Sequence, residues 1–264
     1  MMTHLTSHTP VHYNFFLHYG QMLKADDKQK FVDAMEQEME GLRDIFKVVP
    51  RDSIPPETKP LPAIWAFKQK QLPDWAILKH KARLNVHGGI QHQGINYWET
   101  YAPVVNWLTA RLTMILSLLK NFKCRQIDFV QAFTQAPIDC PMYMEIQAEY
   151  CIRNGKLVYH GADSKNVDKT YVLQLLKNMY GLKQAGYNWY SKITDELIKI
   201  GFKQSNVDKC LFIRQDCVII IYVDNCLIFS KSDQTLAQIV THIGQHFKIT
   251  SSNDIETYLG LEAT

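Results

Sequence analysis

The chain has 264 residues, of which 46% are hydrophobic and 21% charged, the composition of a globular protein with room for one large domain or two lobes. Its net charge of +3 is too small to establish a polyanion partner, and no apolar stretch approaches the roughly 20 residues that span a bilayer. Residues 1–20 lack a basic start and an apolar run, so we expect an intracellular protein with no secretory leader and no membrane partner.

The first predicted element is an amphipathic helix over residues 26–46. Its apolar residues recur at helical spacing, and they are Phe31, Met35, Met39 and Leu42. A proline-rich stretch over residues 51–62 then breaks regular structure. Residues 63–70 and 81–87 alternate like the two strands of a hairpin.

This predicted hairpin is the most basic part of the chain. Between residues 59 and 92 the acid Asp74 stands against six basic residues, which are Lys59, Lys68, Lys70, Lys79, Lys81 and Arg83. Trp65, Phe67 and Trp75 are interleaved with them. Cations with aromatic neighbours suit a nucleic-acid backbone, but the solvated face of an ordinary sheet explains the pattern equally well.

The remaining elements alternate between helices and strands. We predict an apolar helix over residues 109–121, a strand over 123–129, an exposed loop or long hairpin over 154–169 and a helix over 189–200. This order predicts an α+β protein built on an antiparallel sheet. The six cysteines contain no C-x-x-C pair, which favours reduced, mostly buried thiols over a zinc cluster or disulfides.

A second hairpin is predicted over residues 219–229. β-Branched and aromatic residues flank Asp224 and Asn225, two residue types that accept tight turns, so the pattern predicts a strand, an acidic tip and a second strand. If a carboxylate from upstream meets this tip, the pair can hold magnesium ions, and Asp128 is the candidate. Taken alone, each aspartate fits a turn or a strand end just as well.

Five sequence blocks resemble the reverse transcriptase domain of Ty1/copia-type retrotransposons. They are KARL at 81–84, GINYWETYAPV at 94–104, DFVQAF at 128–133, YGLKQA at 180–185 and YVD at 222–224. The resemblance implies an α+β right-hand polymerase fold, with fingers and palm around an antiparallel sheet and with thumb and RNase H absent or truncated. It also implies one continuous domain. Residues 1–30 are a poorly defined segment, 31–120 are the N-terminal helix and fingers, and 121–264 are the palm with a returning fingers segment at about 135–186.

The resemblance implies the chemistry of nucleotide transfer to a primer 3′-hydroxyl. Asp128 and Asp224, with the backbone carbonyl of Phe129, are expected to bind two Mg²⁺ ions, for which Mn²⁺ can substitute. The expected substrates are an RNA template, a DNA primer and deoxynucleoside triphosphates.

Further roles follow from matching positions. Arg83 and Lys81 are expected near the triphosphate, where a guanidinium fork or an ammonium suits phosphate oxygens. Phe133 is expected under the sugar, and Gly181 and Lys183 beside the nucleotide and template. The residues expected to contact nucleic acid are Lys68, Lys70 and Tyr222.

Asn225 departs from the Tyr-Val-Asp-Asp of many relatives and removes one negative charge from a site for two dications. Three explanations stay open: the site tolerates the amide, its activity is impaired, or this copy belongs to a decaying element. The alternative to a polymerase is a non-catalytic nucleic-acid-binding remnant, and a scaffold domain is a third interpretation. The implied setting is a Pol polyprotein with RNase H and integrase, in the cytoplasm or a virus-like particle. No oligomeric state is predicted.

Overall fold

The computed structural model describes residues 14–71, 76–161, 169–252, 257–258 and 261–262. The chain forms two compact units. The first unit consists of Met1–Gln91 and Pro141–Leu182, and the second of His92–Cys140 and Lys183–Thr264. Helices are combined with antiparallel sheets, which confirms the predicted mixture of helices and antiparallel strands.

The first unit contains two three-stranded sheets and a hairpin. One sheet has the order β1 (Asn14–Leu17), β3 (Ala63–Gln71), β4 (Ile77–Val86). The other has the order β2 (Phe46–Pro50), β9 (Tyr171–Lys177), β6 (Pro137–Met144), and β6 belongs to this unit from Pro141 onward. The hairpin pairs β7 (Tyr150–Arg153) with β8 (Lys156–Tyr159). The helical elements are α1 (Tyr19–Met22), α2 (Lys28–Gly41), η1 (Arg51–Ser53) and η2 (Gly88–Ile90).

Helix α2 is shorter than the predicted helix over residues 26–46. It ends at Gly41, and Phe46 already belongs to β2, where it pairs with Leu175 of β9. The end of the predicted helix is therefore replaced by a strand, because Phe46 pairs with β9. The predicted stripe itself is buried, and the Phe31 ring lies 5.5 Å from that of Phe67 in β3.

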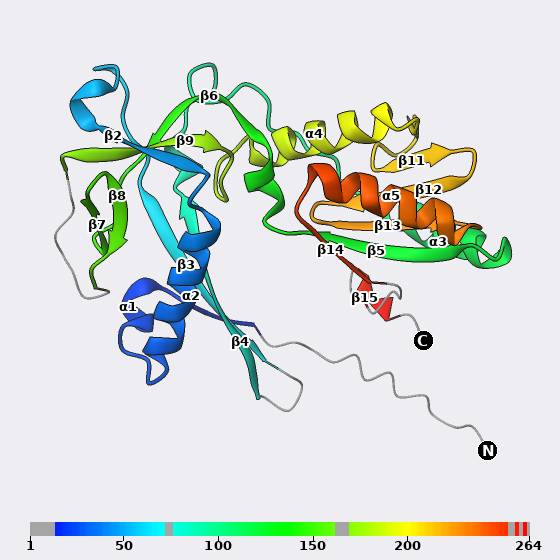
Figure 1. Cartoon of the computed structure of the whole chain (residues 1–264), viewed down its shortest axis with the longest axis horizontal. Helices are drawn as coiled ribbons and strands as arrows, with labels where there is room; N and C mark the ends of the chain where they lie inside the picture. Colours follow the sequence, from blue (N-terminus) through cyan, green and yellow to red (C-terminus); the bar gives the residue numbers. More distant parts are fainter. Residues whose placement is uncertain (1–13, 72–75, 162–168, 253–256, 259–260, 263–264) are drawn as a thin grey trace. The chain divides into compact units, whose positions relative to one another are not determined.

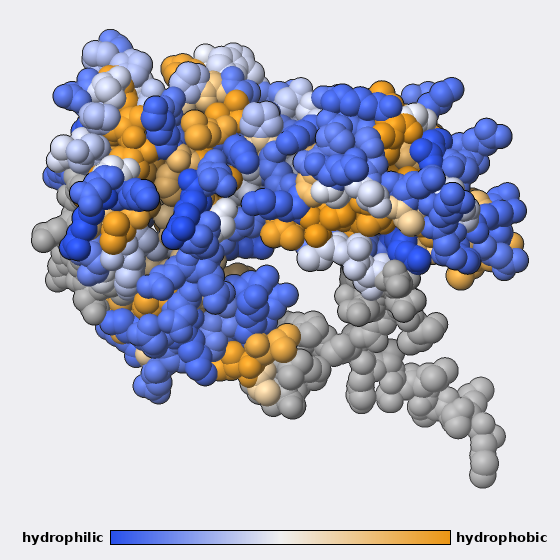
Figure 2. Space-filling model, in the orientation of Figure 1, coloured by the Kyte–Doolittle hydropathy of each residue, from blue (hydrophilic) through white to orange (hydrophobic). Residues whose placement is uncertain are grey.

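The hairpin β3–β4 has one buried and one open side. Trp65, Phe67, Ala82 and Leu84 alternate on the side that is buried. Hydrophobic residues also gather at the end of this hairpin in Figure 2, where Ile77 and Leu78 are exposed, while the surface over α1 and α2 is mainly hydrophilic. The strands thus follow the expected alternation of period two.

The second unit is built on a six-stranded antiparallel sheet. Its strand order is β10 (Lys203–Gln204), β11 (Leu211–Arg214), β12 (Cys217–Tyr222), β13 (Asn225–Ser230), β5 (Lys123–Phe129) and β14 (Ile249–Ser252). Its helices are α3 (Trp107–Leu119), η3 (Ala132–Gln135), α4 (Ala185–Lys199) and α5 (Asp233–His246). Strands β15 (Thr257–Tyr258) and β16 (Leu261–Glu262) form a separate pair.

One side of the six-stranded sheet packs against two helices, and we call it the two-helix face. Its strand residues are Ile127, Phe129, Cys217, Ile219, Ile221, Cys226 and Ile228. They form a continuous core with Trp189, Ile193 and Leu197 of α4 and with Leu236, Ile239 and Ile243 of α5. In Figure 1, α5 lies across β12 and β13.

The opposite side packs against α3, and we call it the one-helix face. Its strand residues are Cys124, Val218, Ile220, Leu227 and Phe229. Helix α3 buries its small residues, Ala110, Thr113 and Ser117, and exposes large apolar ones, with Leu108 and Leu119 exposed to 73% and 75%. Small side chains let a helix approach closely, because the spacing between packed elements depends on the side chains in contact.

All six cysteines are unpaired thiols, as predicted. Four of them are buried, and burial raises the pKa of the Cys217 and Cys210 thiols to about 12. Such thiols are unreactive at neutral pH. Within the residues that the structure describes, no helix combines the length and apolarity needed to cross a membrane.

Candidate functional site

The turn between β12 and β13 consists of Val223 and Asp224. The sequence predicted Asp224 and Asn225 at the tip, but Asn225 is the first residue of β13 and pairs with Tyr222 across the hairpin. The turn therefore lies one residue earlier than expected. Val223 adopts a φ of 54°, a left-handed conformation that is unfavourable for a β-branched residue.

Several contacts hold this turn in place. The backbone N–H of Phe129 donates to the carbonyl oxygen of Asp224 at 2.8 Å, and the indole Nε1 of Trp189 donates to the carbonyl oxygen of Val223 at 2.7 Å. The rings of Phe129 and Trp189 meet edge-on at 4.9 Å, and both lie 5.5 Å from the ring of Phe247. An aromatic cluster on the two-helix face thus supports the strained turn.

Strand pairing brings the predicted acidic residues to one end of the sheet. Asp128 in β5 is the direct Cα partner of Asn225 in β13, and Asp224 precedes Asn225 in the turn. By strand alternation Asp128 and Asn225 share the one-helix face with Cys124 and Leu227. The structure therefore places Asp128, Phe129, Asp224 and Asn225 together.

Asn225 takes part in a hydrogen bond on this face. The side-chain Nε2 of Gln126 donates to Oδ1 of Asn225 at 3.1 Å. Tyr222, the cross-strand partner of Asn225, is half-buried and packs against the core of the one-helix face. No sequence pattern indicated Gln126, because a glutamine two residues before an aspartate has no characteristic signature.

Two other predicted residues also lie in the second unit. Phe133 belongs to η3 and packs, half-buried, against the core of the two-helix face. The ammonium of Lys183 lies 5.0 Å from the centre of the Tyr97 ring, within cation–π range. Phe133 thus makes the core contact that a structural aromatic would make.

In the first unit, the open side of β3–β4 carries the predicted basic residues. Lys68 is the direct cross-strand partner of Lys81, and Lys70 is the partner of Lys79. Arg83 follows on the same side, two residues after Lys81. We call Lys68, Lys70, Lys79, Lys81 and Arg83 the basic face. Like charges directly opposite each other destabilise a sheet, so this arrangement suits an anionic partner.

The electrostatics of the basic face support the same conclusion. Burial, together with the charges of Lys70 and Arg83, lowers the pKa of the Lys68 ammonium. Burial and four neighbouring cations also lower the pKa of Lys81. Among the described residues, no carboxylate forms an ion pair with the basic face. Instead, the Arg83 guanidinium lies 4.7 Å from the Tyr180 ring centre, and the Lys68 ammonium 5.3 Å from that of Phe16.

Gly181 has a conformation that only glycine fits. Its φ is 92°, and a Cβ atom at this position would lie 2.0 Å from the carbonyl oxygen of Val86. The N–H of Val86 also donates to the carbonyl oxygen of Tyr180 at 2.8 Å. The close backbone approach predicted for this glycine is thus made to β4 of its own unit.

A family model described as reverse transcriptase (RNA-dependent DNA polymerase) matches residues 43–264. The chain belongs to the reverse transcriptase family. It is 28% identical over 249 residues to the retrovirus-related Pol polyprotein from transposon TNT 1-94 of Nicotiana tabacum, which covers 92% of this chain and 18% of that relative. It is also 28% identical over 267 residues to the truncated transposon Ty1-A Gag-Pol polyprotein of Saccharomyces cerevisiae, with 96% and 20% covered.

A third relative is the retrovirus-related Pol polyprotein from transposon RE1 of Arabidopsis thaliana. The identity is 29% over 219 residues, which covers 80% of this chain and 14% of the relative. The chain thus spans a fifth or less of the length of these relatives. Together, the matches establish a reverse transcriptase domain of the Ty1/copia type.

The aromatic residues of the basic segment have a different place from the one that the sequence suggested. Trp65 and Phe67 of this reverse transcriptase domain are buried on the side of β3–β4 opposite to the lysines. They are core residues and cannot stack on nucleic-acid bases. Trp75 lies outside the described residues. Among the residues that the structure describes, Phe16 and Tyr180 contact cations of the basic face.

Trp189 is a structural contributor to the site that the sequence did not indicate. The reverse transcriptase domain uses its indole both as core and as hydrogen-bond donor to the turn. A buried tryptophan usually finds a partner for its N–H, but nothing in the sequence connects position 189 with position 223. Such a contact becomes visible only once the packing of α4 on the sheet is known.

Proposed function

We propose that this chain is the fingers and palm of an RNA-directed DNA polymerase, with the first unit as fingers and the second as palm. The observation that supports it best is the pairing of Asp128 with Asn225, which brings Asp224 to the same end of the sheet. The hydrogen bond from Phe129 to Asp224 fixes the strand end to the turn. One carboxylate on a strand and one on the adjoining turn, both held in place, are what divalent metal ions require in nucleotidyl transfer.

The donor set fits magnesium. Asp128 and Asp224 offer carboxylate oxygens, Phe129 a carbonyl oxygen and Asn225 an amide oxygen, and hard dications prefer oxygen ligands. Bound metal ions would supply activation of the primer hydroxyl and neutralisation of the triphosphate. These four residues would hold two Mg²⁺ or Mn²⁺ ions, while the strained but well-supported turn keeps Asp224 in position.

Asn225 would weaken the site without dismantling it. Its side chain is an uncharged amide, so one negative charge is missing at the position opposite Asp128. Its amide oxygen also already accepts a hydrogen bond from Gln126. Weaker metal binding follows, because charged oxygens hold Mg²⁺ better than an amide does. We therefore expect a slow polymerase whose rate is limited at this position.

The other residues would bind nucleotide and nucleic acid. Arg83 and Lys81 would contact the triphosphate, and Lys68 and Lys70 the nucleic-acid backbone, which would relieve the repulsion within the basic face. Phe133 would face the deoxyribose, and Gly181 and Lys183 would lie beside the nucleotide and template. Tyr222 would contact the primer end from its place next to the turn.

Single-nucleotide addition to a DNA primer on an RNA template tests this function. The unaltered chain is compared with Asn225→Asp and Asp128→Asn, each with Mg²⁺ and with Mn²⁺. We expect slow addition by the unaltered chain, a rise of about tenfold or more for Asn225→Asp and no product for Asp128→Asn. Absence of product from both the unaltered chain and Asn225→Asp contradicts the catalytic function.

A second candidate function is nucleic-acid binding without synthesis. The observation that favours it is the basic face, because its paired lysines repel each other and a bound anion would relieve that repulsion. This binding does not require that the acidic turn hold metal ions. Binding of an RNA–DNA duplex should then weaken steeply with salt, and Lys68→Ala should lower the salt slope by about 1. Lys203→Ala, an exposed lysine of β10, is the control and should leave the slope unchanged.

The relatives named above are Pol and Gag-Pol polyproteins, which leads to a proposal about partners. In this setting the chain would act beside RNase H and integrase domains, in the cytoplasm or within a particle. Co-purification of the chain with separately expressed RNase H and integrase domains of its own element tests this proposal. A lack of interaction under conditions of low salt would contradict it.

A further inference from the structure

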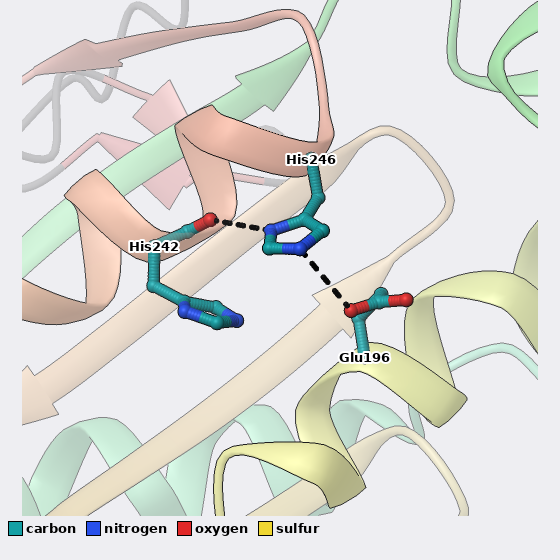
Figure 3. A group of neighbouring side chains, drawn as sticks. All are labelled: Glu196, His242 and His246. Atoms are coloured by element: carbon teal, nitrogen blue, oxygen red, sulfur yellow. Dashed lines mark hydrogen bonds and ion pairs between the residues drawn. The ribbon is translucent and has the colours of Figure 1, made fainter.

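Three potential metal ligands, one from α4 and two from α5, lie close together. His242 and His246 lie one turn apart on α5, with ring centres 4.7 Å apart, and Glu196 faces them from α4. One ligating atom from each residue can be chosen so that all lie within 4.8 Å of one another. Figure 3 shows the two imidazoles and the carboxylate pointing toward one another.

The hydrogen bonds leave the right atoms available. Nδ1 of His246 lies 3.1 Å from the carbonyl oxygen of His242, so this nitrogen carries a proton and donates, which in the neutral imidazole leaves the lone pair on Nε2. This Nε2 lies 4.0 Å from Oε2 of Glu196. A histidine that donates to a carbonyl with one nitrogen and presents the other is the usual form of a metal ligand.

His242 adds an independent indication. Its Nε2 is shielded from solvent and has no hydrogen-bond partner among the residues that the structure describes. A buried polar atom without a partner costs free energy, and such atoms are few in folded proteins. Coordination of a metal ion would satisfy this nitrogen.

Glu196 divides its two oxygens between two partners. Oε1 accepts from the Lys199 ammonium at 2.7 Å, which leaves Oε2 on the side of His246. The Glu196 side chain is only 15% exposed, so it sits between the helices and not in bulk solvent. One carboxylate oxygen is thus held in place while the other faces the imidazoles.

The donor set indicates the class of metal. Two imidazole nitrogens and one carboxylate oxygen suit Zn²⁺ and related transition metals, whereas Mg²⁺ and Ca²⁺ prefer oxygen alone. Tetrahedral bonds of about 2.0–2.1 Å would place the ligating atoms about 3.4 Å apart, so the side chains would rotate toward one another on binding. The fourth position would hold water, since His246 is partly exposed.

We propose that Glu196, His242 and His246 form a transition-metal site, best matched by Zn²⁺, that links α4 to α5. Both helices pack on the two-helix face, so the site is separate from Asp128 and Asn225, which lie on the opposite face. The ion stabilises the folded domain because it binds the assembled ligands and not the unfolded chain. This role does not depend on polymerase activity.

Titration of the metal-free chain with Zn²⁺, and with Co²⁺ as a spectroscopic probe, tests the site. We expect one tightly bound ion, the visible absorption of tetrahedral Co²⁺ and a rise in melting temperature. H242A/H246A should lose all three effects, and E196Q should bind about 10–100-fold more weakly. Asp128→Asn should retain them, which separates this site from the proposed polymerase site.

A control variant tests whether other histidines of the chain bind the ion. His4, His8 and His12 repeat with the same four-residue spacing in the sequence, so H4A/H8A/H12A is the matched variant and should still bind the ion. If H242A/H246A folds poorly, a second measurement on the unaltered chain takes its place. Bound Zn²⁺ should then protect His242 and His246 from modification by diethyl pyrocarbonate. Unchanged binding by E196Q, full binding by folded H242A/H246A or absence of protection would each overturn the site.

Discussion

The two faces of the six-stranded sheet are built in opposite ways. On the two-helix face, large residues such as Trp189 and Phe129 point inward and form a dense core. On the one-helix face, α3 turns Ala110 and Thr113 inward and leaves Leu112 and Ile115 exposed. The residues that bear the proposed chemistry, Asp128 and Asn225, lie on this second face.

The residues that hold the turn in place and the side chains proposed to bind metal therefore lie on different faces of the sheet. The hydrogen bond and ring contacts that fix the turn come from the two-helix face, through Trp189 and Phe247. The side chains of Asp128 and Asn225 are displayed on the other side, where less of the surface is committed to packing. Stability should therefore depend on the first face much more than on the second, and three substitutions test this.

The largest effect is expected for Trp189→Ala. Loss of a buried indole leaves a cavity and removes the bond to Val223, so the free energy of unfolding should fall by about 3–5 kcal/mol. Trp107→Ala on α3 is the matched control, because that tryptophan is 47% exposed, and it should cost less than about 1 kcal/mol. Urea unfolding measures both. Equal losses would remove the distinction between the faces.

An intermediate effect is expected for Ala110→Leu. This alanine is fully buried where α3 meets the sheet, and a larger side chain would push the helix away, at a cost of about 1–3 kcal/mol. Leu112→Gln, on the exposed side of the same helix, should change stability by no more than about 0.5 kcal/mol. Thermal unfolding compares the two. A larger loss for Leu112→Gln would mean that the exposed leucine side is packed in solution.

The smallest effect is expected for Val223→Gly, and it should be stabilising. A left-handed conformation costs a non-glycine residue about 1–2 kcal/mol, whereas the extra flexibility of glycine costs roughly 0.5–1 kcal/mol. The free energy of unfolding should therefore rise by about 0.5–1 kcal/mol. Val218→Gly, within β12, serves as control and should destabilise. A loss of stability in Val223→Gly would show that the valine side chain supports the turn.

Local sequence patterns predicted much of the fold. The strand over residues 123–129 has the predicted bounds, because β-branched and apolar alternation is a local property. The pattern could not tell which side of α3 is buried, since composition favours burying Leu112 and the close approach to the sheet selects Ala110 instead. The turn was misplaced because Asn225 is a better turn former than Val223 in isolation.

The candidate site was less accessible from sequence. The meeting of Asp128 and Asp224 rested on family resemblance, because strand register over such a separation is set by tertiary packing. The pairing of Lys68 with Lys81 likewise required the register of β3 and β4. His242 and His246 show a ligand-like spacing in the sequence, but nothing there points to Glu196 on another helix.

The hydrogen bond from Gln126 to Asn225 has an evolutionary consequence. An aspartate at this position would offer an oxygen in the same place, so the bond survives exchange in either direction. In the metal-free fold, however, an aspartate would place a second negative charge directly opposite Asp128, so selection for stability alone favours the amide. Selection on DNA synthesis favours the aspartate instead, and a copy of the element released from that selection can carry Asn225 at no cost to the fold.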